Sequence, residues 1–307
     1  MLCCAHCRVR YPNVRDICAR CGVLLRPPVR PHVIAGRFLL VRTIGAGTMG
    51  VVHLARDLAT GAPVALKIAP PTGGRHPAVV ERFAHEVQVL AAVQSRHVVA
   101  VRAWGVESGR PWLAMEHVDG LDLDLLVTEY AARGESMPLA RVLSIARDVA
   151  RGLEAVHAAG IAHRDVKPAN VIVEDATGRA VLVDFGLART FVRGSALSLG
   201  AGTPWYMAPE QEEAEEDDVM PREVSPRTDV YALGCTLFEL FTGRPPFDAR
   251  DPSALRRMHA SERAPALSSL RPSLAPLDEP FARALAKRAD ARWQSCAEFV
   301  EALQSTA

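Results

Sequence analysis

Two kinds of apolar pattern follow each other along the chain. Between residues 37 and 69, apolar and polar positions alternate in short runs that are typical of β-strands: "RFLLVRTIG", "GVVHLARD" and "PVALKIA". Later runs are longer and repeat with a helical period: "LARVLSIARDVARGLEAVHAAG", "RTDVYALGCTLFELFTG" and "FARALAKRADARWQSCAEFVEALQ". Because the strands precede the helices instead of alternating with them, the pattern predicts an α+β fold and not a doubly wound sheet.

Three segments lie outside this pattern. Residues 1–25 contain five of the seven cysteines, and residues 26–35 begin with "RPPVRP". Proline fixes φ and keeps its preceding residue out of the helical region, so the second segment is predicted to be an extended, fairly stiff linker. The third segment, residues 210–227, is the acidic run "EQEEAEEDDVMPREVSPR". We interpret it as a solvated loop, with a docking surface for a basic substrate as the alternative.

The composition narrows the classes of protein to consider. The chain has 307 residues, of which 49% are apolar, so it can bury a sizeable core. Its formal net charge of +1 argues against a strongly basic nucleic-acid surface. No run reaches the roughly 18 apolar residues of a membrane span, and the start "MLCCAHCRVR" lacks the apolar core of a signal peptide. We therefore expect a cytoplasmic protein with reduced cysteines and no membrane or nucleic-acid partner.

The spacing of the N-terminal cysteines indicates a metal site. Two residues separate Cys4 from Cys7 and Cys18 from Cys21, and ten residues lie between the pairs. Two tight turns of this kind can aim four thiolates at one point, which is the tetrahedral sulfur shell that suits structural Zn²⁺. The segment has too few apolar residues to fold unaided, so the metal would supply most of its stability.

Two alternatives to zinc stay open for the N-terminal cysteines. A redox-active pair and unpaired thiols are both compatible with the spacing. Cys3 and His6 are further candidate ligands because they neighbour Cys4 and Cys7. Cys235 and Cys296, by contrast, lie far apart in apolar helical runs. We interpret these two as small buried hydrophobic residues.

A glycine-rich turn follows the first predicted strand. "GAGTMGVV" places Gly45, Gly47 and Gly50 where backbone amides can approach phosphate oxygens, and Val52 on the return strand can cover an aromatic base. Glycine-rich turns are common, so this motif alone is a weak indication of nucleotide binding.

The next strand and helix add a paired charge. In "PVALKI", Ala65 and Lys67 share one face of a strand, which puts a small side chain beside the base and an ammonium group near the phosphates. In "AVVERFAHEVQVLAAV", Glu86 shares a helical stripe with the apolar Phe83 and Leu90. A carboxylate on an inward stripe needs a cation, and Lys67 is the candidate.

The stretch "IAHRDVKPANVIV" concentrates charge between apolar runs, and "VDFG" follows after a short apolar strand. Asp165 can orient a hydroxyl group and accept its proton, and Lys167 can neutralise a phosphoryl group in transfer. Asn170 and Asp184 offer oxygen ligands to Mg²⁺. The chemistry that this set predicts is phosphoryl transfer.

Taken together, these motifs resemble the eukaryotic-like, bacterial-type serine/threonine protein kinases from about Gly36 to Leu303. They occur in the family's order: "GAGTMGVV", "VALK", Glu86, "HRDVKPAN", "DFG" and "APE". The resemblance implies a bilobal kinase fold, with a small antiparallel β-sheet lobe plus helix C over residues 36–118 and a large, mainly α-helical lobe over residues 119–307. Residues 1–25 resemble a zinc ribbon.

The resemblance also implies the cofactors and a nucleotide pocket. ATP and Mg²⁺ are the expected cofactors, with Mn²⁺ as a substitute for Mg²⁺. Met115 would guard the back of the pocket, the backbone of Glu116 to Val118 would bond the adenine, and Ile172 would lie beneath it. The full set of residues expected around ATP is Ile44, Gly45, Gly47, Gly50, Val52, Ala65, Lys67, Glu86, Met115, Glu116, Val118, Ile172 and Asp184.

Further residues would organise the catalytic machinery of this family. His163 and Phe185 would stack with Leu90 in an apolar column whose base Asp229 anchors. Glu210 of "APE" would form a buried ion pair with Arg292 of "RADARWQS".

The resemblance also indicates the substrate class and a mode of control. Lys167 in the catalytic loop and Thr203 in "GTPWYMAPE" are typical of serine/threonine kinases. Arg164 before the catalytic acid often indicates control by phosphorylation of the activation segment. The candidate phosphorylation sites are Ser195 and Ser198, then Thr190, with ordinary solvent-facing side chains as the alternative; Thr203 is expected to be structural.

Three functions are compatible with these observations. The first is an active protein kinase that phosphorylates serine or threonine on unknown proteins and on itself. The second is a pseudokinase scaffold that holds partners through its fold and zinc module; such proteins typically lose the residues equivalent to Lys67, Asp165 or Asp184, and all three are present. The third, a zinc-dependent nucleic-acid binder, has little support from a near-neutral chain. A regulatory partner at the zinc module fits either of the first two.

Overall fold

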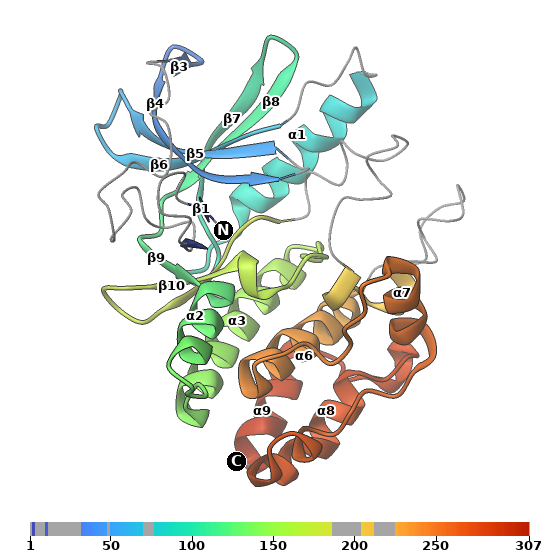
Figure 1. The fold of residues 1–307 in the computed structure, drawn as a ribbon. Coiled ribbons are helices and arrows are strands. Elements are labelled where there is room, and N and C mark those ends of the chain that lie inside the picture. Colours follow the sequence, from blue (N-terminus) through green and yellow to red (C-terminus); the bar gives the residue numbers. More distant parts are fainter. Residues whose placement is uncertain are drawn as a thin grey trace. The chain divides into compact units, whose positions relative to one another are not determined.

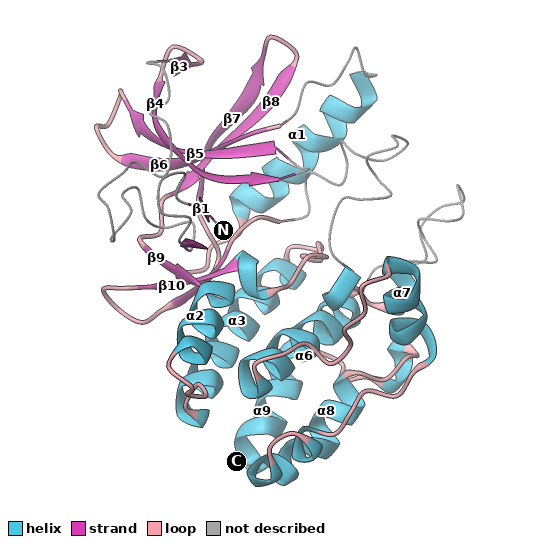
Figure 2. Ribbon diagram, in the orientation of Figure 1, coloured by secondary structure: helices cyan, strands magenta, loops and turns pink. Residues whose placement is uncertain are grey.

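The computed structural model describes residues 2–3, 10–11, 32–47, 50–69, 77–185, 204–211 and 225–306. The chain divides into two compact units, whose elements Figure 1 labels and Figure 2 colours by type. Unit 1 comprises Met1–Ala92, Val99–Val118 and Leu187–Ala201. Unit 2 comprises Val93–Val98, Asp119–Gly186 and Gly202–Ala307.

Within its described residues, unit 1 is built on a six-stranded antiparallel sheet with one helix, α1 (Pro77–Ala92). The strand order is β3-β4-β5-β6-β8-β7. The bounds are β3 (Val33–Ile34), β4 (Phe38–Gly47), β5 (Gly50–Asp57), β6 (Pro63–Ile68), β7 (Val101–Glu107) and β8 (Arg110–Glu116). The three strands expected from period-two alternation are confirmed, and the short edge strand β3 is an addition that the pattern did not predict.

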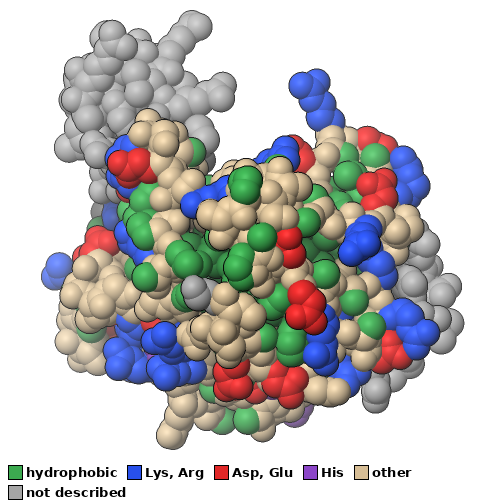
Figure 3. Space-filling model, turned by 90° about the horizontal axis from the view of Figure 1, so that it is seen from below, with side chains coloured by type: hydrophobic (Ala, Val, Ile, Leu, Met, Phe, Trp, Pro, Cys, Tyr) green, Lys and Arg blue, Asp and Glu red, His purple; other side chains and the backbone are tan. Residues whose placement is uncertain are grey.

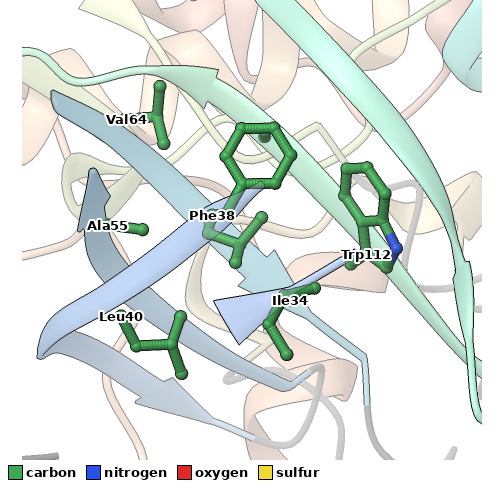
Figure 4. Close-up of a cluster of buried hydrophobic side chains, with 8 residues drawn as sticks. Ile34, Phe38, Leu40, Ala55, Val64 and Trp112 are labelled. Atoms are coloured by element: carbon green, nitrogen blue, oxygen red, sulfur yellow. The ribbon is translucent and has the colours of Figure 1, made fainter. Parts of the chain in front are cut away.

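Alternation along these strands creates a hydrophobic core on one face of the sheet. Phe38 and Trp112 belong to this core, with ring centroids 5.3 Å apart. Figure 4 shows the side chains converging from several strands. The cluster consists of Ile34, Phe38, Leu40, Ala55, Val64, Leu66, Trp112 and Ala114. Burial of this apolar surface stabilises the sheet and leaves the other face for different residues.

Unit 2 is mainly helical. Its α-helices are α2 (Leu123–Ala132), α3 (Leu139–Ala158), α6 (Pro226–Thr242), α7 (Pro252–Ser261), α8 (Asp278–Ala284) and α9 (Cys296–Thr306). Its 3₁₀ helices are η1 (Pro168–Asn170), η4 (Pro204–Tyr206), η5 (Leu267–Ser269), η6 (Pro272–Leu277) and η7 (Ala289–Ala291). Helices α3 and α9 both pack against α6, which is buried along nearly its whole length. The small sheet of unit 2 has the order β11-β10-β9, with β9 (Gly120–Asp122), β10 (Val171–Glu174) and β11 (Ala180–Leu182).

The last apolar run of the sequence is not one long helix. The run over residues 281–304 divides into the end of α8, the 3₁₀ turn η7 and most of α9. The guanidinium of Arg292 donates to the carbonyls of Ala286 and Lys287, at 2.7 and 2.9 Å. These carbonyls are therefore bonded by a side chain where a continuous helix would bond them to backbone amides. The helical interpretation of this segment was wrong for residues 285–295.

Several other sequence predictions bear on the fold. Cys235 and Cys296 are fully buried, as expected, and burial raises the pKa of both thiols. The cysteines at 4, 7, 18 and 21 lie outside the described residues, as does most of the linker over residues 26–35. Short strands β1 (Leu2–Cys3) and β2 (Arg10–Tyr11) pair antiparallel on either side of residues 4–9. No helix in the described part of the chain is long and apolar enough to cross a membrane.

The surface carries both signs of charge. On the face shown in Figure 3, lysine and arginine side chains and aspartate and glutamate side chains form separate small groups among apolar and uncharged ones. This mixture fits the formal net charge of +1. The visible face therefore carries no broad single-sign field of the kind that steers nucleic acid.

Candidate active site

The register of the small sheet in unit 2 places two polar loop residues together. Strands β10 and β11 pair with Val171 opposite Leu182, so the residue before β10 and the residues after β11 lie at the same end. The amide of Val183 donates to the carbonyl of Asn170 at 2.9 Å, which extends this pairing by one step. Asn170 and Asp184 are therefore neighbours because of strand register, although 13 residues separate them in the sequence.

The carboxylate of Asp165 is held by two side chains of its own loop. Lys167 Nζ and Asn170 Nδ2 both donate to Asp165 Oδ2, each at 2.8 Å. Asn170 Nδ2 also lies 2.8 Å from the Asp165 carbonyl oxygen. The single turn of η1 brings Asn170 back over Asp165, with the amide of Asn170 donating to the carbonyl of Lys167. The structure thus brings together the three residues predicted to be catalytic.

A buried carboxylate from α6 holds the start of this loop. Asp229 is fully buried, and it accepts hydrogen bonds from the amides of His163 and Arg164, both at 2.8 Å. His157 Nε2, at the end of α3, lies 2.7 Å from Asp229 Oδ2. Burial raises the pKa of Asp229, but the bond and charge of His157 outweigh that effect, so its pKa lies below the usual range. Asp229 therefore supports the loop as a carboxylate.

Two residues of the site have positive φ angles. Arg164 has φ +65° and Asp184 has φ +57°, the left-handed region that L-residues other than glycine seldom adopt. Such conformations persist where surrounding contacts hold them, and they cluster at functional sites. After Asp184, the ring of Phe185 packs on the buried ring of His163 with centroids 4.5 Å apart. Burial lowers the pKa of His163, which keeps the imidazole neutral.

The ion pair expected between Glu210 and Arg292 is present and bidentate. Arg292 is 1% exposed, and its Nη1 and Nη2 donate to the two carboxylate oxygens of Glu210 at 2.8 and 2.9 Å. Thr228 Oγ1 donates to the same carboxylate at 2.8 Å. Burial raises the pKa of Glu210, but the hydrogen bonds and charge of Arg292 outweigh that effect, so the net shift is downward.

The residues predicted to surround a nucleotide share one face of the sheet in unit 1. Val52 pairs with Lys67, and Ala65 pairs with Met115. Directly opposed residues in antiparallel strands point to the same side, so these four lie on the face opposite the Phe38 cluster. Helix α1 packs on this same face through Phe83, whose ring meets that of Trp104 at a centroid distance of 6.4 Å.

The glycine turn depends on one of its glycines more than on the others. Gly50 has φ +124°, and a Cβ placed there would lie 2.3 Å from the carbonyl oxygen of Ile68. A Cβ on Gly47 would meet nothing within 4 Å, and one on Gly45 would meet only Val52 at ordinary contact distance. Only glycine can therefore occupy position 50 without a shift of the backbone. At the end of β8, the Glu116 amide donates to the Ala100 carbonyl at 2.8 Å.

The positions of several predicted residues do not test their roles. Ile44 lies within β4, Val118 ends the middle segment of unit 1, Leu90 is buried in α1, and Ile172 lies in β10 of unit 2. Their contacts with a nucleotide, and the contact of Leu90 with His163 and Phe185, stay predictions. The phosphorylation candidates Thr190, Ser195 and Ser198, and Thr203, lie outside the described residues.

Sequence reasoning missed one residue that contacts the catalytic loop and one that contacts its support, Asp229. His157 contacts Asp229, and Gln211 Nε2 donates to the carbonyl of Arg164 at 2.9 Å. His157 lies within a regular helical apolar pattern, and Gln211 lies within the acidic run over residues 210–227. Neither position carries a local signal of its function because the partners lie 72 and 47 residues away.

The oxygen donors present fit a magnesium ion. The amide nitrogen of Asn170 is used by Asp165, which leaves its Oδ1 as the atom that can bind a cation. Asp184 follows the neighbouring strand β11 and supplies a carboxylate. Mg²⁺ typically takes one or two protein oxygens and completes its shell with phosphate and water. Within the described residues, no group of three or more His, Cys, Asp or Glu side chains could hold a metal without such help.

Known proteins share this arrangement. Residues 38–303 match the protein kinase domain family. The chain is 37% identical over 272 residues to the serine/threonine-protein kinase PknF of Mycobacterium tuberculosis, covering 87% of this chain and 55% of PknF. It is 36% identical over 278 residues to PknB of the same species, covering 87% of this chain and 42% of PknB. The chain thus spans about half the length, or less, of these curated relatives.

Solved structures agree with the sequence relatives. The kinase domain of Mycobacterium tuberculosis PknI superposes with a TM-score of 0.73 at 32% sequence identity. The superposition covers 91% of this chain and all of that domain. The prediction of an α+β kinase fold is therefore confirmed, whereas the zinc ribbon is not tested by these similarities.

Proposed function

This chain belongs to the protein kinase domain family, and we propose that it transfers the γ-phosphoryl group of ATP to serine or threonine hydroxyls of proteins. The observation that carries the proposal is the Asp165 carboxylate, held at one oxygen by both Lys167 and Asn170. The serine/threonine kinases similar to it, PknF and PknB, support the same activity. Membership of the family implies ATP and Mg²⁺ as cofactors.

The chain's own residues divide the chemical tasks. Asp165 orients the substrate hydroxyl and accepts its proton as the oxygen attacks phosphorus. Lys167, which is bonded to Asp165, offsets negative charge on the phosphoryl group. When bound, Mg²⁺ would neutralise the phosphate oxygens, with Asn170 and Asp184 as its protein ligands. Because the transition state is loose, alignment and charge neutralisation supply most of the rate enhancement.

The residues of unit 1 serve binding. Backbone amides of the turn at Gly45, Gly47 and Gly50 approach the phosphates, and Lys67 adds a positive charge on the same sheet face as Val52. Ala65 and Met115, paired across β6 and β8, line the adenine side of that face.

Replacing Asp165 with Asn tests the proposal. The amide keeps the shape of the side chain but cannot accept the hydroxyl proton, so phosphate incorporation from radiolabelled ATP should fall by about 10²–10⁴-fold. The dissociation constant of Mg-ATP should change by less than about twofold, because Asp165 is not a proposed ligand. Asp175, in the exposed turn after β10, provides the control, and D175N should match wild type.

Two results would contradict the kinase assignment. Full activity in D165N would remove Asp165 from the catalytic role. Nucleotide binding without any phosphate incorporation by the wild-type protein would favour the pseudokinase scaffold, in which the fold holds partners.

For the N-terminal segment, we propose a structural zinc ion bound by Cys4, Cys7, Cys18 and Cys21. The paired spacing supports this ligand set, and strands β1 and β2 pair antiparallel on either side of the first cysteine pair in the sequence. The module would then offer a docking surface for a regulatory partner. The bound metal would keep residues 1–25 folded, and a chelator would unfold them.

Metal analysis of purified protein tests the ligand set. Wild-type protein and C3S should each contain zinc at a one-to-one ratio, whereas C4S and C18S should lose it. Cys3 is the matched control because it neighbours Cys4 outside the proposed set. Protein without zinc, or with zinc retained in C4S and C18S, would refute the proposal.

We further propose that phosphorylation within the activation segment controls the activity. A phosphate at Ser195, Ser198 or Thr190 would bring about two negative charges near Arg164. Mass spectrometry after incubation with Mg-ATP identifies the modified residue. We place the protein in the cytoplasm, where ATP and reduced thiols are available.

A further inference from the structure

The two peptides on either side of Arg164 are bonded by side chains from two distant parts of the chain. On one side of Arg164, its amide donates to Asp229 Oδ1 at 2.8 Å. On the other side, its carbonyl accepts from Gln211 Nε2 at 2.9 Å. The two peptide groups that flank the positive φ of Arg164 are therefore each bonded to a side chain.

Gln211 lies at the end of the "APE" segment and is 6% exposed. Its side-chain Oε1 accepts from the amide of Ala208 at 3.1 Å while its Nε2 donates to Arg164. The backbone amide of Gln211 donates to the carbonyl of Ala208 at 2.9 Å. One amide side chain thus joins the Ala208–Gln211 segment to the peptide immediately before the catalytic acid.

This contact needs both an acceptor and a donor. Glutamate would keep the acceptor for Ala208 but place a negative oxygen against the Arg164 carbonyl. Methionine would keep the volume and lose both bonds, leaving a buried carbonyl without its donor. Asparagine is one methylene shorter. Among similar side chains, only glutamine satisfies the geometry.

The segment that carries Gln211 is itself firmly held. Glu210, the preceding residue, is bonded by the buried guanidinium of Arg292 and by Thr228. A displacement of this segment would therefore act on the Arg164 carbonyl through the glutamine amide. The same displacement would release the left-handed conformation of Arg164, which relaxes when its neighbours stop holding it.

We propose that Gln211 is a positioning residue, which couples the Ala208–Gln211 segment to the catalytic loop and holds Asp165 in the geometry required for phosphoryl transfer. This inference rests on the proposed kinase activity. Gln211 does not touch the reacting atoms; it acts through the Arg164–Asp165 peptide.

The first test compares Q211M with wild type and with Q88M, a change at an exposed glutamine of α1. In Q211M, kcat should fall about tenfold, with KM for ATP and the Mg-ATP dissociation constant within about twofold of wild type. Hydrogen exchange of the amides of residues 163–166 should be about threefold or more faster in Q211M. Q88M should match wild type in each measurement.

A second variant tests the hydrogen bond itself. In Q211E, the ionised carboxylate repels the Arg164 carbonyl, whereas the protonated acid can donate to it. The ratio of kcat in Q211E to kcat in wild type should therefore rise as pH falls from about 8 to about 6, because burial raises the pKa of a carboxyl group. His163, Asp165 and Asp229 face the same loop in both proteins, so pH effects common to the two proteins cancel in the ratio. Q211M should show no such recovery.

The outcomes separate this inference from the kinase proposal. Wild-type protein without activity refutes the proposed function, and the hydrogen-exchange comparison still decides the role of Gln211. Active wild type with unchanged kcat and exchange in Q211M refutes the positioning role. If Q211M and Q211E both fail to bind Mg-ATP, or if kcat in Q211E is independent of pH relative to wild type, Gln211 serves only the fold and the inference is rejected.

Discussion

The two units position their functional residues by different means. In unit 1, Val52, Ala65 and Lys67 share a face because strand register and alternation leave them no other side. In unit 2, the loop that carries Asp165 is not part of a β-sheet. Asp229 of α6 and Gln211 bond its peptides instead, and His157 of α3 bonds Asp229.

The two units differ in which residues hold the functional positions in place. Register in a sheet is set by the strands themselves and by the apolar cluster around Phe38 and Trp112. The loop of unit 2 instead depends on Asp229 and Gln211, which lie 65 and 47 residues beyond the Arg164 atoms that they bond. A single change in unit 2 should therefore affect both folding and activity, whereas a change on the functional face of unit 1 should affect mainly activity.

The largest expected effect is that of Arg292→Ala in unit 2. The change leaves Glu210 half-buried without its cation and removes donors from the carbonyls of Ala286, Lys287 and Arg227. Loss of one partner from such a pair typically costs about 3–5 kcal/mol. Urea unfolding should report this loss. Arg288→Ala is the control because the Arg288–Asp290 pair is 81% and 58% exposed, and it should leave stability unchanged. Equal stability of R292A and wild type would break the comparison.

The next effect is expected from Lys67→Met in unit 1, which separates activity from stability. Loss of the ammonium should lower kcat/KM for ATP about 100-fold, or about 2.7 kcal/mol of transition-state stabilisation. The free energy of unfolding should change by less than about 1 kcal/mol, because the aliphatic stem is retained. Arg56→Met, at an exposed position of β5, should change neither quantity. A large loss of stability in K67M would show that unit 1 depends on its functional side chains as unit 2 does.

Gly50→Ala probes the register of the glycine turn directly. The new Cβ would meet the Ile68 carbonyl at 2.3 Å, and φ +124° is strained for alanine. We expect a loss of about 2 kcal/mol in the free energy of unfolding and weaker Mg-ATP binding by titration calorimetry. Gly47→Ala is the matched change in open space, with an effect below about 0.5 kcal/mol. Similar effects of the two substitutions would contradict the special role of position 50.

The smallest effect concerns Asp122, which caps α2 by accepting the amide of Leu125 at 2.8 Å. Burial, with a smaller contribution from the charge of Asp124, raises the pKa of Asp122 to about 6. The folded state therefore binds more protons than the unfolded state between about pH 4 and pH 6, so this group lowers stability as pH rises through that window.

Asparagine caps as well as aspartate and does not titrate. Asp122→Asn should match wild type near pH 4 and exceed it by about 1 kcal/mol at pH 7, with allowance for partial solvent screening. Urea unfolding at both pH values measures the difference. A wild-type advantage that grows with pH would show that the carboxylate is favoured in the fold and would reverse the assigned sign.

Some of these features could be read from the sequence because their causes are local. Alternation predicted β4, β5 and β6, helical period predicted α1, α3 and α6, and residue type and order predicted Asp165, Lys167 and Asn170. The break in the last apolar run could not be predicted from period alone. Its cause is the Arg292 guanidinium. This group bonds Glu210, which lies 82 residues earlier in the sequence, and donates to the carbonyls of Ala286 and Lys287.

The sequence by itself determined the kind of fold, the residues with the right chemistry and the faces on which strand residues lie, because these follow from spacing and side-chain type. Only the tertiary structure decided that Gln211 bonds the catalytic loop and His157 bonds Asp229, and that Arg164 and Asp184 adopt left-handed backbone conformations. The contacts of Gln211 and His157 join side chains that lie 47 and 72 residues from their partners in the sequence. No local pattern records such an encounter.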